Sequence, residues 1–334
     1  MKIQDALVLK RGYDLPESKR IKGQYTVYSS NGVAGYHNKY KVEGPAVITG
    51  RSGSLGTVQY TENNCWPLNT TLFVSDFKGN NPKYIRYLLQ TLHLEKYGSG
   101  SAVPTLNRNH LDSLEIPFYS LIEQQHIVDI IGSIDDKIEN NNKIIEKIDK
   151  LGVIKYKLLN DTFDEFCNFA IFKKGKEALS QNYTEENNND NINFIRVKDL
   201  NSLTNTYIPK NLNIPIANPS DILISFDGAI GRINYGLYGA YSSGIYKVIP
   251  YFKNNYGILY WALKDNYNQQ IMLEHTNGTT ILHGAKAIPY LKIKKHSSKD
   301  IDFYNNIFNY SLNIKLENIK LNILKQLYLK KFFR

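Results

Sequence analysis

Two segments in different halves of the chain share one pattern, and this repetition limits the folds that the chain can adopt. The segment "ITGRSGSLGTVQY" begins at Ile48, and the segment "ISFDGAIGRINYG" begins at Ile224. Both have a β-branched and apolar lead-in, a Gly-x-x-Gly turn and a short apolar segment that includes a tyrosine. A loop that holds a nucleotide usually occurs once per site, so the second copy indicates a duplicated domain.

The repetition extends over a whole globular unit. In each half of the chain, strand-like segments are followed by a short apolar helix, a Gly-Ser or Gly-Thr turn and a final strand. In this alignment Trp66 corresponds to Tyr241, and residues 114–116 correspond to residues 291–293. The same order of elements in both halves predicts a tandem repeat of two α/β units, and therefore an α+β fold class.

A long segment with helical periodicity follows each globular unit. Its apolar residues recur at steps of three and four, which is typical of a coiled-coil seam. The predicted seams comprise Ile127, Ile131, Ile134, Ile138, Ile145, Ile148, Leu151, Ile154 and Leu158 in the first helix, and Leu312, Leu316, Ile319, Ile323 and Leu327 in the second. An isolated amphipathic helix has too little around it to bury such a stripe, so we expect the two helices to pack on each other.

One position of the first seam holds a polar residue, Asn141. A buried asparagine in a seam can fix the register of two helices. Alternatively, Asn141 lies at the solvent edge of the helix pair. The sequence leaves both interpretations open.

The chain is basic, which favours a polyanionic partner. Its 334 residues include 41 Lys and Arg against 31 Asp and Glu, a formal net charge of +10. This charge favours nucleic acid ahead of a membrane surface. The first residues do not have the pattern of a signal peptide, and no run reaches the roughly 18 apolar residues of a membrane span. We therefore expect a cytoplasmic protein without a membrane partner.

Patterns for catalysis and metal binding are missing from the sequence. The Gly-rich loops lack the Gly-Lys-Ser/Thr ending of a nucleotide loop, and the seven histidines are scattered without a zinc motif. The segment "NPKY" at Asn81 superficially resembles an amino-methyltransferase motif, but Lys83 replaces the second proline and the following residues predict a helix. We predict no catalytic residue, metal or cofactor for this chain.

The loops of both units carry residue types that bind nucleic acid. Arg and Lys bind phosphates or guanine edges, Asn reads adenine, and backbone N–H groups in Gly-rich turns fit phosphate oxygens. The candidate DNA contacts are Lys19, Arg20, Ser30, Asn31, Arg51, Ser52, Asn69 and Arg108 in the first unit, and Asp227, Arg232, Ser242, Ser243, Thr279, His283 and Lys286 in the second.

These segments together resemble a known family. "AVITGRSGSLGTV", then "GSGSAVPTLNRNHLDSLEIPF" followed by "IEQQHIVDIIGSIDDKIENNNKIIEKI", and their second-half counterparts resemble the specificity (S) subunit of type I restriction-modification systems. The resemblance spans essentially the whole chain, and the junction "LEIPFYSLIEQQHIVDIIGSIDDKI" is its most specific part. It implies target recognition domains at residues 1–120 and 161–302. Residues 121–160 and 303–334 would be spacer helices, paired as an antiparallel coiled coil.

The resemblance also implies a function without catalysis in this chain. Each recognition domain would read one half of a split target in double-stranded DNA. The helices would set the spacing of the half-sites and dock two methyltransferase (M) subunits, together with restriction/translocase (R) subunits. S-adenosylmethionine, ATP and Mg would be bound by those partner subunits, and this chain would bind no cofactor.

Two other functions remain as alternatives. A coiled-coil structural adaptor would bind DNA without regard to its sequence. A self-sufficient nuclease or methyltransferase would need a nucleotide-binding or metal-carboxylate constellation, and we find none in the sequence.

The junction between the second globular unit and the second long helix departs from the family pattern, because it lacks counterparts of Pro117, Gln124 and Gln125.

Overall fold

The computed structural model describes residues 1–99, 104–201, 206–276 and 283–333. The chain divides into two compact units. The first unit comprises Met1–Lys137 and Leu321–Arg334, and the second comprises Ile138–Lys320. Within the described ranges, no helix is both long and apolar enough to cross a membrane.

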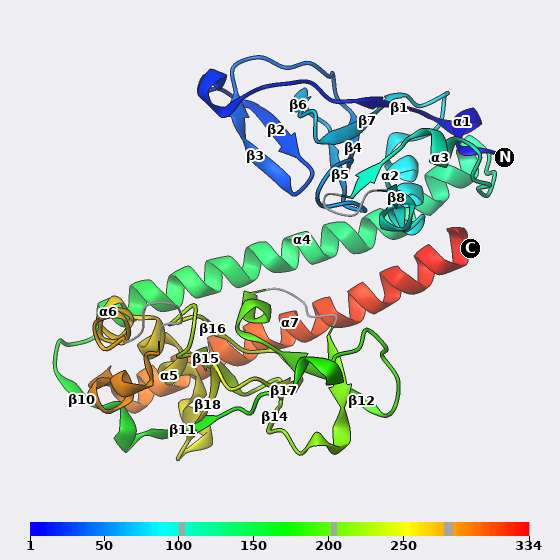
Figure 1. The fold of residues 1–334 in the computed structure, drawn as a ribbon. Helices are drawn as coiled ribbons and strands as arrows, with labels where there is room; N and C mark the ends of the chain where they lie inside the picture. Colours follow the sequence, from blue (N-terminus) through cyan, green and yellow to red (C-terminus); the bar gives the residue numbers. More distant parts are fainter. Residues whose placement is uncertain (100–103, 202–205, 277–282, 334) are drawn as a thin grey trace. The chain divides into compact units, whose positions relative to one another are not determined.

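The first unit is built on two small sheets (Figure 1). An antiparallel sheet has the order β1-β7-β4-β5, with bounds Val8–Arg11, Thr71–Asp76, Ala46–Gly50 and Val58–Thr61. A second sheet has the order β3-β2-β6, with bounds Gly32–His37, Tyr25–Ser29 and Cys65–Pro67. The remaining elements are α1 (Ile3–Ala6), η1 (Glu17–Lys19), α2 (Pro82–Thr91), η2 (Leu94–Tyr97), the pair β8 (Gly98–Ser99) and β9 (Thr105–Leu106), and α3 (Asn109–Asp112).

The second unit repeats this plan. Its first sheet has the order β11-β18-β15-β16, with bounds Ala170–Lys174, Ile245–Pro250, Ile222–Ser225 and Ile233–Asn234. Its second sheet has the order β13-β12-β17-β14, with bounds Tyr207–Pro209, Asn191–Ile195, Gly239–Tyr241 and Ile216–Ala217. Strands β12 and β17 are parallel, as are β2 and β6, so pairing direction is repeated as well as order. The tandem repeat predicted from the sequence is confirmed.

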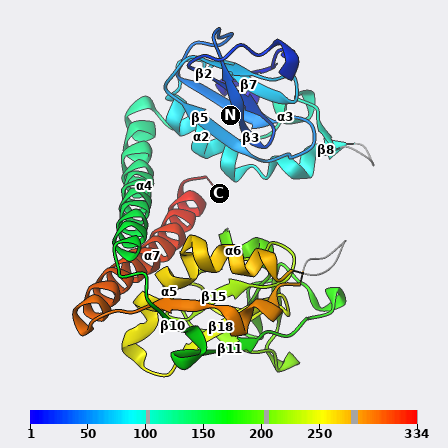
Figure 2. The same cartoon turned by 90° about the vertical axis from the view of Figure 1, so that its left-hand side faces the viewer.

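Helices and short pairs complete the second unit. Figure 2 shows α5 and α6 beside the sheet that contains β15 and β18. The additional elements are the pair β10 (Phe163–Glu165) and β19 (Lys292–Lys294), α5 (Tyr256–Lys264), α6 (Asn266–Glu274), η3 (Phe166–Asn168), η4 (Ser180–Asn182), η5 (Val197–Asn201), η6 (Lys210–Leu212), η7 (Lys253–Asn255) and η8 (Ala285–Tyr290). The long helices α4 and α7 span Leu121–Lys157 and Ser298–Phe333.

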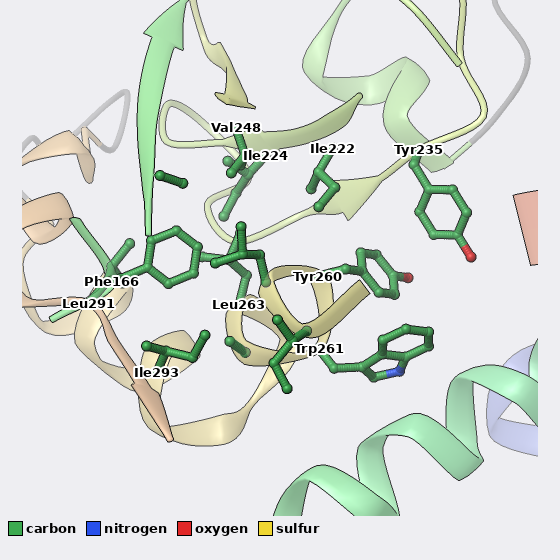
Figure 3. Packing of buried hydrophobic residues seen from close by; sticks show 14 of the residues in the cluster. Phe166, Ile222, Ile224, Tyr235, Val248, Tyr260, Trp261, Leu263, Leu291 and Ile293 are labelled. Atoms are coloured by element: carbon green, nitrogen blue, oxygen red, sulfur yellow. The ribbon is translucent and has the colours of Figure 1, made fainter. Parts of the chain in front are cut away.

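The core of the second unit lies between its sheet and its helices. Ile222, Ile224 and Val248 of the sheet are fully buried against residues of α5. Figure 3 shows Trp261 extending from α5 toward α4. Gly152 of α4 makes this contact possible, because a Cβ at that position would lie 2.0 Å from Trp261 Nε1. The aromatic ring therefore packs directly on the helix backbone.

Helix α2 begins where the sequence places a capping pattern. Asn81 precedes the helix, and its Oδ1 accepts hydrogen bonds from the backbone N–H groups of Lys83 (2.9 Å) and Tyr84 (3.3 Å). Pro82 occupies the first turn, where its missing N–H costs no helical hydrogen bond. The "NPKY" segment is thus a helix start, as the sequence predicted.

Both long helices begin with the same capping box. In the first turn of α4, Glu123 Oε2 accepts from the backbone N–H and the hydroxyl of Ser120, the residue before the helix, each at 2.8 Å. In the first turn of α7, Asp300 Oδ2 accepts from the same two groups of Ser297, at 2.9 Å and 2.7 Å. The second junction therefore keeps the cap, although it lacks the glutamine pair of the first.

In the first unit, α4 and α7 run in opposite directions. The Tyr119 hydroxyl, just before α4, donates to the carbonyl of Phe332 near the end of α7 (2.9 Å). Farther along α4, Asp135 Oδ1 accepts from Nζ of Lys325 (2.6 Å). Between these two contacts the residue number rises along α4 and falls along α7, so the two helices are antiparallel.

The second unit has the same antiparallel pairing. Asn141 Nδ2 donates to Asn318 Oδ1 over 2.8 Å, and Lys155 lies 3.8 Å from the carboxylate of Asp300. From Asn141 to Lys155 the residue number on α4 rises, whereas that of the partner on α7 falls from Asn318 to Asp300, so the two helices again run in opposite directions. The predicted antiparallel helix pair is confirmed.

Part of the predicted seam is wrong. Ile127, Ile131 and Ile134 are buried as expected, but Leu151, Ile154 and Leu158 are exposed. Beyond Ile148 the buried face of α4 instead runs through Gly152 and Tyr156, because the helix packs there on the aromatic core of the second unit. On α7, Ile319, Ile323 and Leu327 are also exposed.

Candidate nucleic-acid interface

The two Gly-x-x-Gly loops have the same backbone conformation. In the first unit Gly53 and Gly56 have φ angles of +85° and +81°, and in the second Gly228 and Gly231 have φ angles of +71° and +76°. Only glycine adopts this left-handed region at little cost, so the spacing of the glycines sets the turn. The loops are turns between strands, as the sequence predicted.

Hydrogen bonds around the two loops also correspond. The backbone N–H of Gly50 donates to Thr57 O (3.2 Å), and that of Ser225 donates to Arg232 O (2.9 Å). An isolated antiparallel bridge then joins each loop to a segment farther along the chain. This bridge pairs Ser52 with Thr105 in the first unit and Asp227 with His283 in the second.

The loop of the first unit borders a basic cleft. The cleft has a volume of about 690 Å³ and is lined by Lys10, Arg11, Arg51, Leu72, Ser99, Thr105, Leu106, Asn107 and Arg108. Four of these side chains are cations, and the described lining contains no carboxylate. A concave surface of one charge sign is the electrostatic pattern that binds phosphate. Arg51 and Arg108 were predicted contacts, and the structure brings them together in this cleft.

Two cations of the cleft were not predicted from the sequence. Lys10 and Arg11 are on β1 and are exposed. Arg11 Nε and Arg51 Nη1 both donate to the carbonyl of Asn69, each over 3.3 Å. The sequence did contain a signal for these two residues, because two adjacent basic residues at the end of a short apolar strand are unusual in a buried sheet and indicate an exposed edge. The sequence alone does not show that β1 lies beside the loop.

The hairpin between β2 and β3 extends the surface next to the loop. Thr57 Oγ1 donates to Ser30 O (2.7 Å), so the hairpin tip contacts the loop (Figure 1). Asn31 at the tip is exposed, whereas the Ser30 side chain is buried. Lys19 and Arg20 lie outside the hairpin, at and just after the end of η1, and Arg20 Nη1 donates to the carbonyl of Ala34 on β3 (2.9 Å).

In the second unit, the predicted contacts come from three segments around the loop. Asp227 and Arg232 are on the loop itself, His283 bridges to it, and Lys286 is exposed on η8. Ser243 lies on the third segment, where its hydroxyl donates to Glu177 Oε2 (3.0 Å).

Two predicted residues of the second unit need separate mention. Ser242 is 4% exposed, so its side chain is not at the surface in this structure. Thr279 lies outside the described residues. Among the described residues, no group of three or more His, Cys, Asp or Glu side chains is arranged to hold a metal ion.

Comparisons with known proteins agree on one family. A family model described as "Type I restriction modification DNA specificity domain" matches residues 1–150 and 160–295. The chain is 27% identical over 124 residues to the type I restriction enzyme EcoprrI specificity subunit of Escherichia coli, covering 37% of this chain and 31% of that protein. It is 31% identical over 136 residues to the MjaIX specificity subunit of Methanocaldococcus jannaschii, covering 38% of this chain and 30% of that protein. These alignments span less than a third of each relative.

A solved structure has the same fold over the whole chain. The S subunit of a type I restriction-modification system from M. genitalium matches with a TM-score of 0.60 at 20% identity. The match covers 100% of this chain and 95% of that chain.

Proposed function

Because the chain belongs to the family of type I restriction-modification DNA specificity domains, of which it contains two matching regions, we propose that it selects the DNA sequence on which such a system acts. One globular unit would read each half of a split target in double-stranded DNA. The observation that carries this proposal is the repeated loop cluster, because each unit has a similarly folded loop bordered by polar or basic side chains.

The two clusters differ in chemistry, which supports two different half-sites. The first has Ser52 paired with Thr105, whereas the second has Asp227 paired with His283. In the first unit, Arg51 next to Ser52 also lines the basic cleft. Hydroxyl, guanidinium, carboxylate and imidazole groups have different preferences for base edges. Loops with the same backbone and different side chains would therefore read different bases.

We assign no catalytic step to this chain. The methylation of adenine and the cleavage of DNA would be performed by methyltransferase and restriction/translocase subunits. S-adenosylmethionine, ATP and Mg would be bound by those subunits.

Exposed apolar residues on the long helices support docking of partner subunits. Leu151, Ile154 and Leu158, which we call the α4 stripe, are 49%, 59% and 80% exposed. Their spacing of three and four places them on one face of the helix. An apolar face that the described chain leaves uncovered is typical of a protein interface. The paired helices would also fix the distance between half-sites.

The decisive experiment is a genome-wide map of methylated adenines in cells with and without this gene. A gapped, two-part motif that disappears with the gene would support the proposal and identify both half-sites. An unchanged map would contradict it.

A structural adaptor with sequence-indifferent DNA binding is the competing function. The two are separated by competition between a duplex with the mapped motif and random duplexes at fixed salt, because only a sequence reader prefers the motif.

A further inference from the structure

Asp227 and His283 form a polar pair at the loop of the second unit. Nδ1 of His283 lies 2.8 Å from Oδ1 of Asp227. The Asp227 side chain is 17% exposed and the His283 side chain is 62% exposed. The carboxylate is therefore largely enclosed by protein, whereas the imidazole extends into solvent.

The backbone fixes both members of this pair. The N–H of Asp227 lies 3.4 Å from Gly244 O, and the N–H of Gly284, next to His283, donates to Phe226 O (2.6 Å). A Cβ added at Gly244 would lie 3.3 Å from the Asp227 Cβ, so the backbone at Gly244 packs closely on the base of the Asp227 side chain. Asp227 is thus held by the loop and in turn holds the imidazole.

This geometry determines which ring nitrogen of a neutral His283 carries the proton. An ionised carboxylate only accepts hydrogen bonds, so Nδ1 must be the N–H donor to Asp227. The other nitrogen, Nε2, is then left with a lone pair and acts as an acceptor. The major groove of DNA offers only two kinds of base donor, the N6 amino group of adenine and the N4 amino group of cytosine.

We propose that His283 reads an adenine or a cytosine in the half-site of the second unit, through an exocyclic amino group that donates to Nε2. Asp227 is the positioning residue that keeps Nε2 an acceptor. Every base pair carries one such amino group, and its other base presents acceptors that repel the same lone pair, so the contact fixes the orientation of the pair: adenine or cytosine lies on the strand that His283 faces. This inference rests on the proposed function, and it adds the class of base read at one position.

The first unit lacks this device. Its equivalent bridge joins Ser52 to Thr105, and both side chains are hydroxyls. A hydroxyl donates or accepts by rotation, so it does not impose one class of base. We therefore expect the constraint in one half-site only.

The test is selection from a library of randomised DNA duplexes at pH 8, above the ordinary imidazole pKa of about 6.5. The tagged full chain is purified from its own host cells with whatever partners accompany it. The variants are His283→Ala and Asp227→Asn. The amide of Asn donates as well as accepts, so the second variant also permits the ring tautomer with its proton on Nε2.

The expected result is one position of the motif at which the wild type accepts a base pair in one orientation only, with adenine or cytosine always on the same strand. Both variants should weaken the preference there by about tenfold, the typical value of one base-edge contact. Asp227→Asn should in addition admit the reversed pairs, which place guanine or thymine on the strand that faces Nε2. His296→Ala is the control, because His296 lies against the carbonyl of Lys294 outside the loop, and it should leave every position unchanged.

The inference is overturned if the wild type selects a two-part motif but the two variants share no altered position. It is also overturned if, at the altered position, the wild type accepts both orientations of a base pair. A wild type that selects no motif at all would instead contradict the proposed function itself.

Discussion

Asn141 of α4 and Glu317 of α7 are hydrogen-bonded across the helix pair, with Asn141 Nδ2 donating to Glu317 Oε2 over 2.8 Å. The same Nδ2 donates to Asn318 Oδ1. Asn141 is only 1% exposed, which favours the register role over a place at the solvent edge. A slide of α7 by one turn, about 5.4 Å, would separate the donor from both acceptors.

Asn141→Asp should destabilise the helix pair. The new carboxylate would face the carboxylate of Glu317 at the same distance, replacing an attraction by a repulsion. We expect the free energy of unfolding to fall by about 2 kcal/mol at pH 8, with part of the loss recovered near pH 5 as a carboxylate takes up a proton. Denaturant unfolding at both pH values measures this.

Asn140→Asp provides the control. Asn140 is the exposed neighbour on the same helix, so the variant makes the same charge change outside the seam. Equal losses in the two variants would show that the charge on α4, and not the bond to Glu317, causes the effect.

Gly152 should be intolerant of a side chain. Gly152→Ala places a Cβ about where the indole of Trp261 now lies, 2.0 Å from Nε1, and Trp261 is 1% exposed. Overpacking of this kind costs about 1–3 kcal/mol. We expect a lower melting temperature and a red shift of tryptophan fluorescence as the indole becomes exposed to water.

A matched substitution on the same helix should have the opposite effect. Gly132 of α4 has only the Tyr87 hydroxyl nearby, 3.8 Å from an added Cβ. Gly132→Ala should therefore raise stability by about 0.5–1 kcal/mol through the helix preference of alanine. If Gly152→Ala behaved in the same way, the direct packing of Trp261 on α4 would be contradicted.

Lys315 should make stability depend on pH. Burial lowers the pKa of Lys315 to about 8, and its Nζ donates to Asn234 Oδ1 (2.6 Å) and Tyr235 O (3.2 Å). Below pH 8 lysine is protonated in both folded and unfolded chains, so the full cost of burying the charge is present. Above pH 8 the folded chain loses the proton while an unfolded lysine keeps it to about pH 10.4, so stability rises with pH.

The contribution of Lys315 is obtained by comparison with Lys315→Met, which does not titrate. The difference in free energy of unfolding, wild type minus variant, should rise by roughly 1 kcal/mol between pH 8 and pH 9. Lys320→Met is the control on the same helix, since Lys320 is exposed. A flat difference across this range would contradict the lowered pKa of Lys315.

The repeat was predictable because its glycine spacing and apolar periods are local properties of the sequence. The buried face of α4 beyond Ile148 was not predictable, because the helical spacing of Leu151 and Ile154 does not reveal which part of the protein the helix packs against. Gly152 was the missed signal, since a glycine inside a long helix often marks a close approach. The cleft was only half predictable, because Lys10 is on β1 and Arg51 directly follows β4, and these two strands are separated in sequence and meet only through β7.

The α4 stripe should be required for docking and not for folding. Ile154→Glu puts a charge in the middle of the stripe, and the 59% exposure of Ile154 predicts little change in melting temperature. Because burying an unpaired charge at an apolar interface is costly, less methyltransferase should co-purify from host cells. Lys150→Glu, at an exposed position of the same helix, is the control. Equal recovery of the partner with both variants would place docking elsewhere.

Arg51 and Lys10 line the same cleft, yet their substitution should have different effects on DNA binding. Arg51→Ala should cost about 1–3 kcal/mol and relax one base position, if its guanidinium reads a base edge. Lys10→Ala should weaken all duplexes alike and reduce the slope of log affinity against log salt by about 0.9, the value for one phosphate contact. Fluorescence anisotropy over a salt series, with specific and random duplexes, measures both the affinity and its salt dependence.

Lys78→Ala is the control, because Lys78 lies in the turn after β7, and it should change neither quantity. A uniform loss for Arg51→Ala would make Arg51 a phosphate contact, and an unchanged salt slope for Lys10→Ala would remove the cleft from the DNA-binding surface.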